Sequence, residues 1–189
     1  MTGTTNAAAA FRVRRAERRD VPALLALIDA LADYEKLDRP NAEARERLIQ
    51  DAFERDPPRF AAYLAEDPSA GDAVGYAIVL ETYSSFLARP TLYLEDIFVR
   101  PEARCRGAGS ALFAHLAQEA WARGCGRMEW VVLDWNELAQ RFYQKRGARR
   151  LNDWQYYRLD AAGIALLNNT SYSEVTGAPT GLEKETNET

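Results

Sequence analysis

The stretch TLYLEDIFVRPEARCRGAGSALFAHLAQ, residues Thr91–Gln118, decides the fold because it joins a strand, a tight turn and a helix. The β-branched and aromatic residues of Leu92–Val99 predict a strand. Pro101 ends that strand, because proline removes a backbone hydrogen-bond donor. Apolar residues then recur at helical spacing on one face from Ala111 to Ala120. The sequence therefore predicts a strand, a glycine-containing turn and a helix in direct succession.

The turn between this strand and this helix has the spacing R-x-x-G-x-G, from Arg104 through Gly107 to Gly109. Backbone N–H groups at a helix start are unpaired and carry partial positive charge, so a glycine-opened turn there can bind a pyrophosphate. The same spacing also occurs in turns that only join a strand to a helix. A second motif is therefore needed to choose between the two interpretations.

That second motif is NELAQRFYQKRG, which spans Asn136–Gly147. Asn136 is predicted as the N-cap of a helix and Gly147 as the residue that ends it. Tyr143 lies near the end of this predicted helix. Taken by itself, Tyr143 would be interpreted as an aromatic residue packed beside Phe142.

Together these segments resemble the GNAT superfamily of acyl-CoA-dependent N-acyltransferases, and in particular its diamine (spermidine/spermine) and thialysine N-acetyltransferases. The resemblance is carried by LYLEDIFV, the R-x-x-G-x-G turn, VLDWNE and RFYQKRGA, and it covers Phe11–Asp160. It implies an α/β fold with a mixed central sheet flanked by helices. It also implies acetyl-CoA as co-substrate and a homodimeric protein.

An amine acetyltransferase must take a proton from its substrate, because a primary amine with a pKa of about 10.4 is almost entirely protonated near neutral pH. Glu95 and Asp96 are adjacent in the predicted strand, where neighbouring side chains point to opposite faces unless a bulge intervenes. From the residues alone, one carboxylate could be exposed and the other paired with an arginine. The resemblance implies that Glu95 accepts the proton through ordered water and that Asp96 lines the amine pocket. It further implies that Tyr143 protonates the CoA thiolate.

For the cofactor we expect backbone groups of Ile97, Phe98 and Val99 to face the pantetheine arm, with Asn136 bonding to the arm from the other side and Tyr143 near its thiol end. The pyrophosphate would be held by backbone amides of Arg104, Cys105, Arg106, Gly107, Ala108, Gly109 and Ser110. Cys105 stands where the family most often has glycine, and a positive φ there would cost on the order of 1 kcal/mol. Its thiol, beside two arginines, could also be oxidisable.

The expected substrate is a small primary amine, either a diamine, a polyamine or a thialysine-like amino acid. Acidic residues that could face this amine are Glu35, Asp38, Glu81 and Asp96. The same residues could instead lie on a solvent-exposed surface without binding a substrate. VLDWN resembles the thialysine type more than the spermidine type. Acetylation of protein N-termini or lysines is one alternative, and a non-catalytic acetyl-CoA-binding regulatory module is another. Retention of both Glu95 and Tyr143 argues against the regulatory module.

The composition bounds these expectations. The 189 residues are 47% hydrophobic, enough for one sizeable core. A net charge of −4 argues against a nucleic-acid-binding protein, which is normally basic. No apolar run approaches the length of a membrane span and the N-terminus lacks an apolar signal core, so a cytoplasmic protein with no membrane partner is expected. Cys105, Cys125 and His115 have neither disulfide nor metal-site spacing, and no metal is expected.

Periodicity elsewhere predicts an order of strand, two helices, three strands, helix, strand, helix and strand. The segments outside the two motifs are the strand Phe11–Arg15, helices Asp20–Tyr34 and Ala42–Glu54, a hairpin of Phe60–Glu66 and Ala73–Tyr83, and strands Arg127–Leu133 and Trp154–Leu159. Residues 1–10 are expected to be a flexible N-terminus and 11–167 the acetyltransferase domain. Residues 168–189 are polar and aperiodic, which predicts a disordered tail, either lineage-specific or left from expression. The aromatic residues of Trp154–Tyr157 support the expected dimer, since such a cluster is rarely left exposed.

Overall fold

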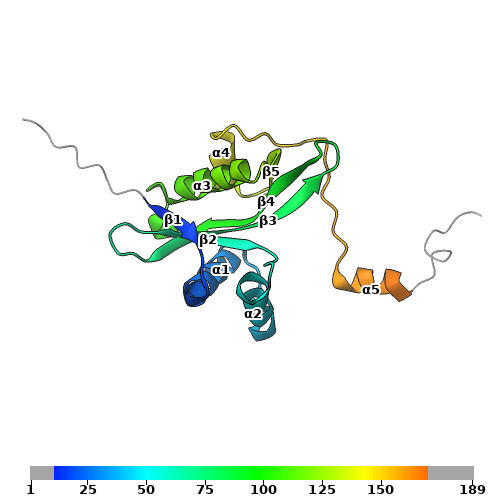
Figure 1. Cartoon of the computed structure of the whole chain (residues 1–189), viewed down its shortest axis with the longest axis horizontal. Coiled ribbons are helices and arrows are strands. Elements are labelled where there is room, and N and C mark those ends of the chain that lie inside the picture. The colour runs from blue at the N-terminus through cyan, green and yellow to red at the C-terminus, as the bar shows by residue number, and fades with distance from the viewer. Residues whose placement is uncertain (1–10, 170–189) are drawn as a thin grey trace, which may run out of the picture. The chain divides into compact units, whose positions relative to one another are not determined.

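The computed structural model describes residues 11–169, which form two compact units, one ending at Asp134 and one beginning at Trp135 (Figure 1). The first unit is built on a five-stranded sheet of order β1-β2-β3-β4-β5. Its strands are β1 (Arg12–Arg15), β2 (Ala61–Glu66), β3 (Ala73–Ser84), β4 (Arg89–Val99) and β5 (Arg127–Glu129). Neighbours from β1 to β4 are antiparallel, whereas β5 runs parallel to β4. The predicted mixed sheet is confirmed.

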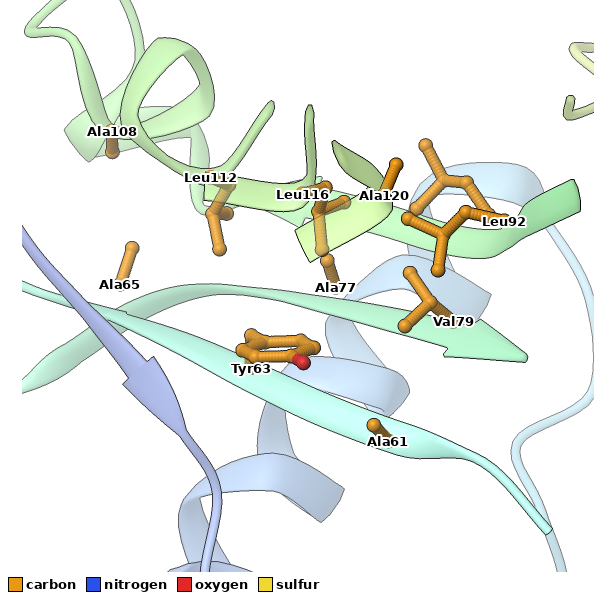
Figure 2. Packing of buried hydrophobic residues seen from close by; sticks show 11 residues of the cluster. Ala61, Tyr63, Ala65, Ala77, Val79, Leu92, Ala108, Leu112, Leu116 and Ala120 are labelled. Atoms are coloured by element: carbon orange, nitrogen blue, oxygen red, sulfur yellow. The ribbon is translucent and has the colours of Figure 1, made fainter. Parts of the chain in front are cut away.

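Helices cover both faces of this sheet (Figure 1). On one face lies α3 (Ala108–Ala122), whose Leu112, Leu116 and Ala120 point toward the sheet and pack with residues of β2, β3 and β4 (Figure 2). On the other lies α1 (Val21–Glu35), whose buried Leu24 and Leu27 belong to a second apolar cluster. We call these the α3 face and the α1 face of the sheet. The apolar spacing of both helices in the sequence corresponds to these two buried faces.

The start of α1 is tied to the sheet by a partly buried ion pair. The helix follows a short turn, η1 (Arg18–Asp20). Arg14 of β1 donates hydrogen bonds to Asp20 at 2.6 and 2.8 Å and to Glu66 of β2 at 2.6 Å. The hydrogen bond from Arg14 lowers the pKa of Asp20 to about 2. The charged form of Asp20 therefore stabilises the fold.

A helical segment between α1 and β2 forms part of the wall on the α1 face. It consists of α2 (Ala42–Ile49), capped by Asn41, and a turn of π-helix, η2 (Gln50–Glu54). Leu48 and Phe53 of this segment pack against the apolar cluster of the α1 face. The predicted second helix is thus present, with a change of helix type near its end.

The second unit contains α4 (Glu137–Gln144) and α5 (Ala161–Asn169). The side-chain oxygen of Asn136 accepts a hydrogen bond from the N–H of Ala139 at 3.2 Å, so the predicted N-cap is confirmed. Gly147 follows α4 with a φ of 83°, the left-handed conformation that glycine adopts without strain. Within residues 11–169, no helix combines the length and the apolar character that crossing a bilayer would require.

The last predicted strand is wrong, because residues 154–159 form no strand and are followed by α5. Aromatic composition favours extended structure only when a neighbouring strand takes up the backbone N–H and C=O groups. In the described part of the chain no strand pairs with this segment. The side chains are instead exposed, to 75% for Trp154 and 83% for Tyr157.

Two other boundaries differ from the prediction. β5 pairs over only three residues, Arg127–Glu129, and the predicted continuation to Leu133 is not a strand. Asn168 and Asn169 end α5, whereas the predicted tail began at Asn168. The rest of that tail, 170–189, and the predicted flexible N-terminus, 1–10, lie outside the described residues.

Candidate active site

A β-bulge in β4 decides where the two adjacent carboxylates lie. Ile78 of β3 pairs with Asp96 and Val79 pairs with Leu94, which leaves Glu95 as an extra residue on β4. A bulge disrupts the strict alternation of side chains between the two faces of a sheet. The two carboxylates are therefore not forced onto opposite faces.

The residues on either side of this bulge show the change of face. Leu94 belongs to the apolar cluster of the α3 face, whereas Phe98 belongs to that of the α1 face. Without a bulge, these two even-numbered positions would share a face. As a result, Glu95 and Asp96 both line one cavity of about 620 Å³. Its other lining residues are Leu48, Arg59, Phe60, Ile78 and Leu80.

Asp96 is the most perturbed carboxylate of this cavity. Burial and, to a lesser extent, the charges of Glu95 and Glu35 raise the pKa of Asp96 to about 6. The hydroxyl of Tyr76 donates a hydrogen bond to Asp96 at 3.1 Å, which opposes this rise. Burial also raises the pKa of Glu35. The charges of Glu95 and Glu35 thus act on Asp96, and a cation bound beside Asp96 would relieve that repulsion.

The predicted acidic residues do not all reach this cavity. Glu35 ends α1, and its charge acts on Asp96 although it is not a lining residue. The charge of Glu81 acts instead on Cys125, which packs against the apolar cluster of the α3 face. Asp38 is exposed in the segment after α1. The structure therefore brings Glu35, Glu95 and Asp96 together and leaves Glu81 and Asp38 apart from them.

The predicted anion-binding turn leads into α3. Gly107 is the N-cap of this helix with a φ of 106°, and its C=O accepts the N–H of Ala111 at 2.9 Å. The N–H groups of Ala108 and Gly109 precede that bond, so they have no partner within the helix. The space where a Cβ of Gly107 would lie is open. The helix start thus offers outward N–H groups of the kind that bind phosphate.

The two arginines of the turn hold it in place through their side chains. Arg104 donates a hydrogen bond from Nε to the C=O of Val99 at 3.0 Å, and its guanidinium lies 4.7 Å from the ring centre of Tyr34. Arg106 forms an ion pair with the buried Asp67 at 2.9 Å. These contacts fix the turn so that its backbone N–H groups can contact a ligand.

Cys105, between the two arginines, has a positive φ, the conformation for which the sequence predicts a cost when glycine is replaced. Its φ is 59°, a conformation in which a Cβ is strained. The residue is exposed. Whether its thiol is oxidisable stays a prediction.

The edge of β4 that faces β5 is paired only at Thr91–Tyr93. Beyond Tyr93, no strand within residues 11–169 pairs with this edge. Ile97, Phe98 and Val99 therefore lie on a stretch of strand whose outer edge pairs with no strand of the described residues, although the C=O of Val99 accepts the hydrogen bond from Arg104. An open edge offers backbone N–H and C=O groups to an extended ligand, as in peptide recognition by strand addition.

Both predicted site residues of the second unit belong to α4. Asn136 caps its N-terminus, and Tyr143 lies near its C-terminus. Tyr143 is 8% exposed, and its ring lies edge-on to that of Phe142 at 5.3 Å. The predicted arrangement of cap and tyrosine on one helix is confirmed.

Sequence reasoning missed Arg59, Phe60 and Leu48, which line the cavity from outside β4. Arg59 comes shortly before β2, and pairing of β2 with β3 and of β3 with β4 brings it near the carboxylates. No local pattern marks it in the sequence, since an arginine between two prolines and a strand is unremarkable by itself. In the described residues, no group of three or more His, Cys, Asp or Glu side chains could hold a metal ion.

Comparison with known proteins gives the class that this fold and site define. The model of the acetyltransferase (GNAT) family matches residues 24–148, so the chain belongs to this family of N-acetyltransferases. The predicted family and enzyme class are thereby confirmed.

Two relatives and one solved structure illustrate the match. A thialysine N-epsilon-acetyltransferase of Sus scrofa is 35% identical over 165 residues, covering 82% of this chain and 96% of the relative. The L-ornithine N5-acetyltransferase of Arabidopsis thaliana is 37% identical over 94 residues, 50% of this chain and 41% of the relative. An integron cassette protein from V. cholerae superposes with a TM-score of 0.71 at 22% identity, covering 86% of this chain and 99% of that one.

Proposed function

We propose that this enzyme transfers an acetyl group directly from acetyl-CoA to a small primary amine, a diamine, polyamine or thialysine-like amino acid, held in the cavity beside Glu95 and Asp96. The observation that carries the proposal is the bulge in β4, which places both carboxylates in one cavity. The similarity to a thialysine acetyltransferase and to an ornithine acetyltransferase supports a small amine. A homodimer and a cytoplasmic location are part of the same proposal.

The carboxylates of the cavity divide the work on the amine. Asp96, partly buried and charged above a pH of about 6, holds the substrate ammonium. Glu95 is exposed, so a water molecule can pass the ammonium proton to it. The neutral amine can then attack the thioester carbon, because only the unprotonated nitrogen has a lone pair to donate. The raised pKa of Asp96 makes a bound ammonium its natural partner, since the cation offsets the penalty of burying the carboxylate.

The cofactor side of the site is the open edge of β4 together with the start of α3. Backbone groups of Ile97–Val99 bind the pantetheine arm, and the N–H groups of Ala108 and Gly109 bind the pyrophosphate. Asn136 contacts the arm. Acetyl-CoA supplies the activated thioester, and when its C–S bond breaks Tyr143 donates its hydroxyl proton to the sulfur.

Release of free thiol from acetyl-CoA tests this proposal. The parent chain and Glu95→Gln are compared with a panel of ornithine, lysine, thialysine, putrescine, spermidine and a peptide with a free N-terminus. The parent should acetylate at least one small amine, and Glu95→Gln should lower kcat by about 100-fold, the range of general base catalysis. Turnover of the peptide alone would refute the small-amine assignment and support protein acetylation. Undiminished turnover by Glu95→Gln would remove Glu95 as the base.

A further inference from the structure

The cavity beside Glu95 and Asp96 has charges of both signs. Among the described residues that line it, Arg59 is the only cation. The carboxylates lie on β4, whereas Arg59 shortly precedes β2, with β3 between the two strands. Adjacent strands are about 4.8 Å apart, which separates β2 from β4 by roughly 10 Å. The cavity is therefore bounded by negative charge at β4 and by positive charge beside β2.

Between these charges the walls are apolar. The apolar side chains that line the cavity are those of Ile78 and Leu80 on β3 and of Leu48 on α2. Phe60, which directly precedes β2, also lines it. An apolar wall can pack against the methylene groups of a substrate but cannot satisfy a charged group. The cavity thus matches a ligand with a charge at each end and an aliphatic middle.

The guanidinium of Arg59 forms a hydrogen bond through Nε and through neither of its terminal nitrogens, among the described residues. Its Nε donates to the carboxylate of Asp51 at 2.8 Å, and its backbone N–H donates to the C=O of Asp51 at 2.9 Å. Asp51 belongs to the π-helix η2, a type of turn that is frequent at functional sites. Among residues 11–169, neither terminal nitrogen of Arg59 forms a hydrogen bond, and its side chain is 59% exposed. The outer edge of the guanidinium is thus oriented and available for a carboxylate.

We infer that Arg59 binds the carboxylate of an amino-acid substrate whose side-chain ammonium lies at Glu95 and Asp96. The inference rests on the proposed function and makes Arg59 the residue that selects amino acids over diamines. An extended chain of five single bonds, each near 1.5 Å, spans roughly 6 Å, so an arginine side chain can bridge the remaining distance to β2. A diamine of the same length would leave Arg59 without an anion and would bring a second ammonium toward it.

Ornithine and putrescine form a matched pair for the test, because putrescine is ornithine without its carboxylate. We compare the parent chain with Arg59→Gln and Arg59→Lys, measuring kcat and KM for both amines. Arg59→Gln should lower kcat/KM for ornithine by about 10-fold to 100-fold, since a hydrogen bond to a charged group is lost. Most of that change should appear in KM. Turnover of putrescine should be unchanged or faster, and Arg59→Lys should restore part of the activity toward ornithine because it keeps the charge.

Arg47→Gln is the control for a general change in charge, because Arg47 pairs with Glu43 on α2 and does not line the cavity. It should leave both amines unaffected. An equal effect of Arg59→Gln on ornithine and putrescine, or a parent that prefers putrescine, would overturn the inference while leaving the acetyltransferase assignment intact. If the parent acetylated neither amine but another small amine of the panel, ornithine would be excluded as the substrate while the proposed function would stand. The affinity for ornithine, measured by calorimetry for the parent and for Arg59→Gln, would still decide the role of Arg59. Weaker binding by Arg59→Gln would support the inference, and equal affinities would refute it.

Discussion

Replacing Asp96 by Asn should make the protein more stable and a poorer enzyme. Asparagine has nearly the same shape and can still accept the hydrogen bond from Tyr76, which lies 3.1 Å from the carboxylate. The substitution removes a partly buried charge that is repelled by Glu95 and Glu35. Stability and activity are therefore expected to move in opposite directions, as is common for residues kept for function.

The size of the stability gain follows from the pKa of Asp96, which burial raises from 3.8 to about 6. Because the folded-state pKa is raised, the stabilising contribution of the protonated form is complete below pH 3.8 and is lost as pH rises through about 6. One pKa unit corresponds to about 1.4 kcal/mol, so ionised Asp96 lowers the free energy of unfolding by about 3 kcal/mol at pH 7.5. At pH 5 the folded carboxyl is still mostly protonated, and the loss is about half as large.

Urea denaturation at pH 7.5 and pH 5 measures this difference between Asp96→Asn and the parent. The variant should be more stable by about 3 kcal/mol at pH 7.5, and its advantage should shrink by about half at pH 5. In the parent, KM for the amine should rise as pH falls through 6, because protonated Asp96 no longer attracts an ammonium. In Asp96→Asn, KM should be higher and should lack this dependence.

Asp20→Asn is a control in which the stability is expected to change in the opposite direction. Arg14 holds the pKa of Asp20 at about 2, so its charge stabilises the fold. This variant should lose about 2 kcal/mol at neutral pH. An Asp96→Asn protein that is no more stable than the parent at pH 7.5, or whose advantage does not change with pH, would refute the link between the burial of Asp96 and the stability of the fold.

Three further outcomes are expected. Tyr143→Phe should lower kcat by about 100-fold with little change in acetyl-CoA affinity, because the hydroxyl acts in the transition state; turnover like the parent would place the acid elsewhere. Cys105→Gly should raise the free energy of unfolding by up to about 1 kcal/mol in urea denaturation, since a φ of 59° strains a Cβ, and a loss of stability would contradict this. Sedimentation at micromolar concentration should show a homodimer, weakened by Trp154→Ser, because the exposed aromatic residues of 154–157 favour burial; a monomeric parent would exclude it.

Several features of this protein could be predicted from short stretches of sequence. The strand, turn and α3 of residues 91–118 follow from apolar spacing, Pro101 and the glycines, all of which act over a few neighbouring residues. The cap at Asn136 is equally local, because its side chain bonds to a backbone group three residues on. Even the strain at Cys105 could be expected, since a residue in the place of a turn glycine inherits its φ.

The arrangement of the cavity could not be predicted in this way, because it depends on which strands pair and in which register. The bulge that brings Glu95 and Asp96 together exists only relative to Ile78 and Val79 of β3. Pairing of β2 with β3 in turn brings Arg59 to the cavity, although Arg59 lies far from β4 in the sequence.

The predicted strand at residues 154–159 is absent for the same reason, since strand pairing between distant segments cannot be read from the local sequence. Its aromatic residues favour a strand, but a strand forms only where another supplies hydrogen-bond partners. Sequence by itself thus determined most of the helices and strands, the cap at Asn136 and the family. Tertiary structure alone decided the faces on which the carboxylates lie, the position of Arg59 and the strand edges that stay open, because backbone pairing between distant segments sets all three.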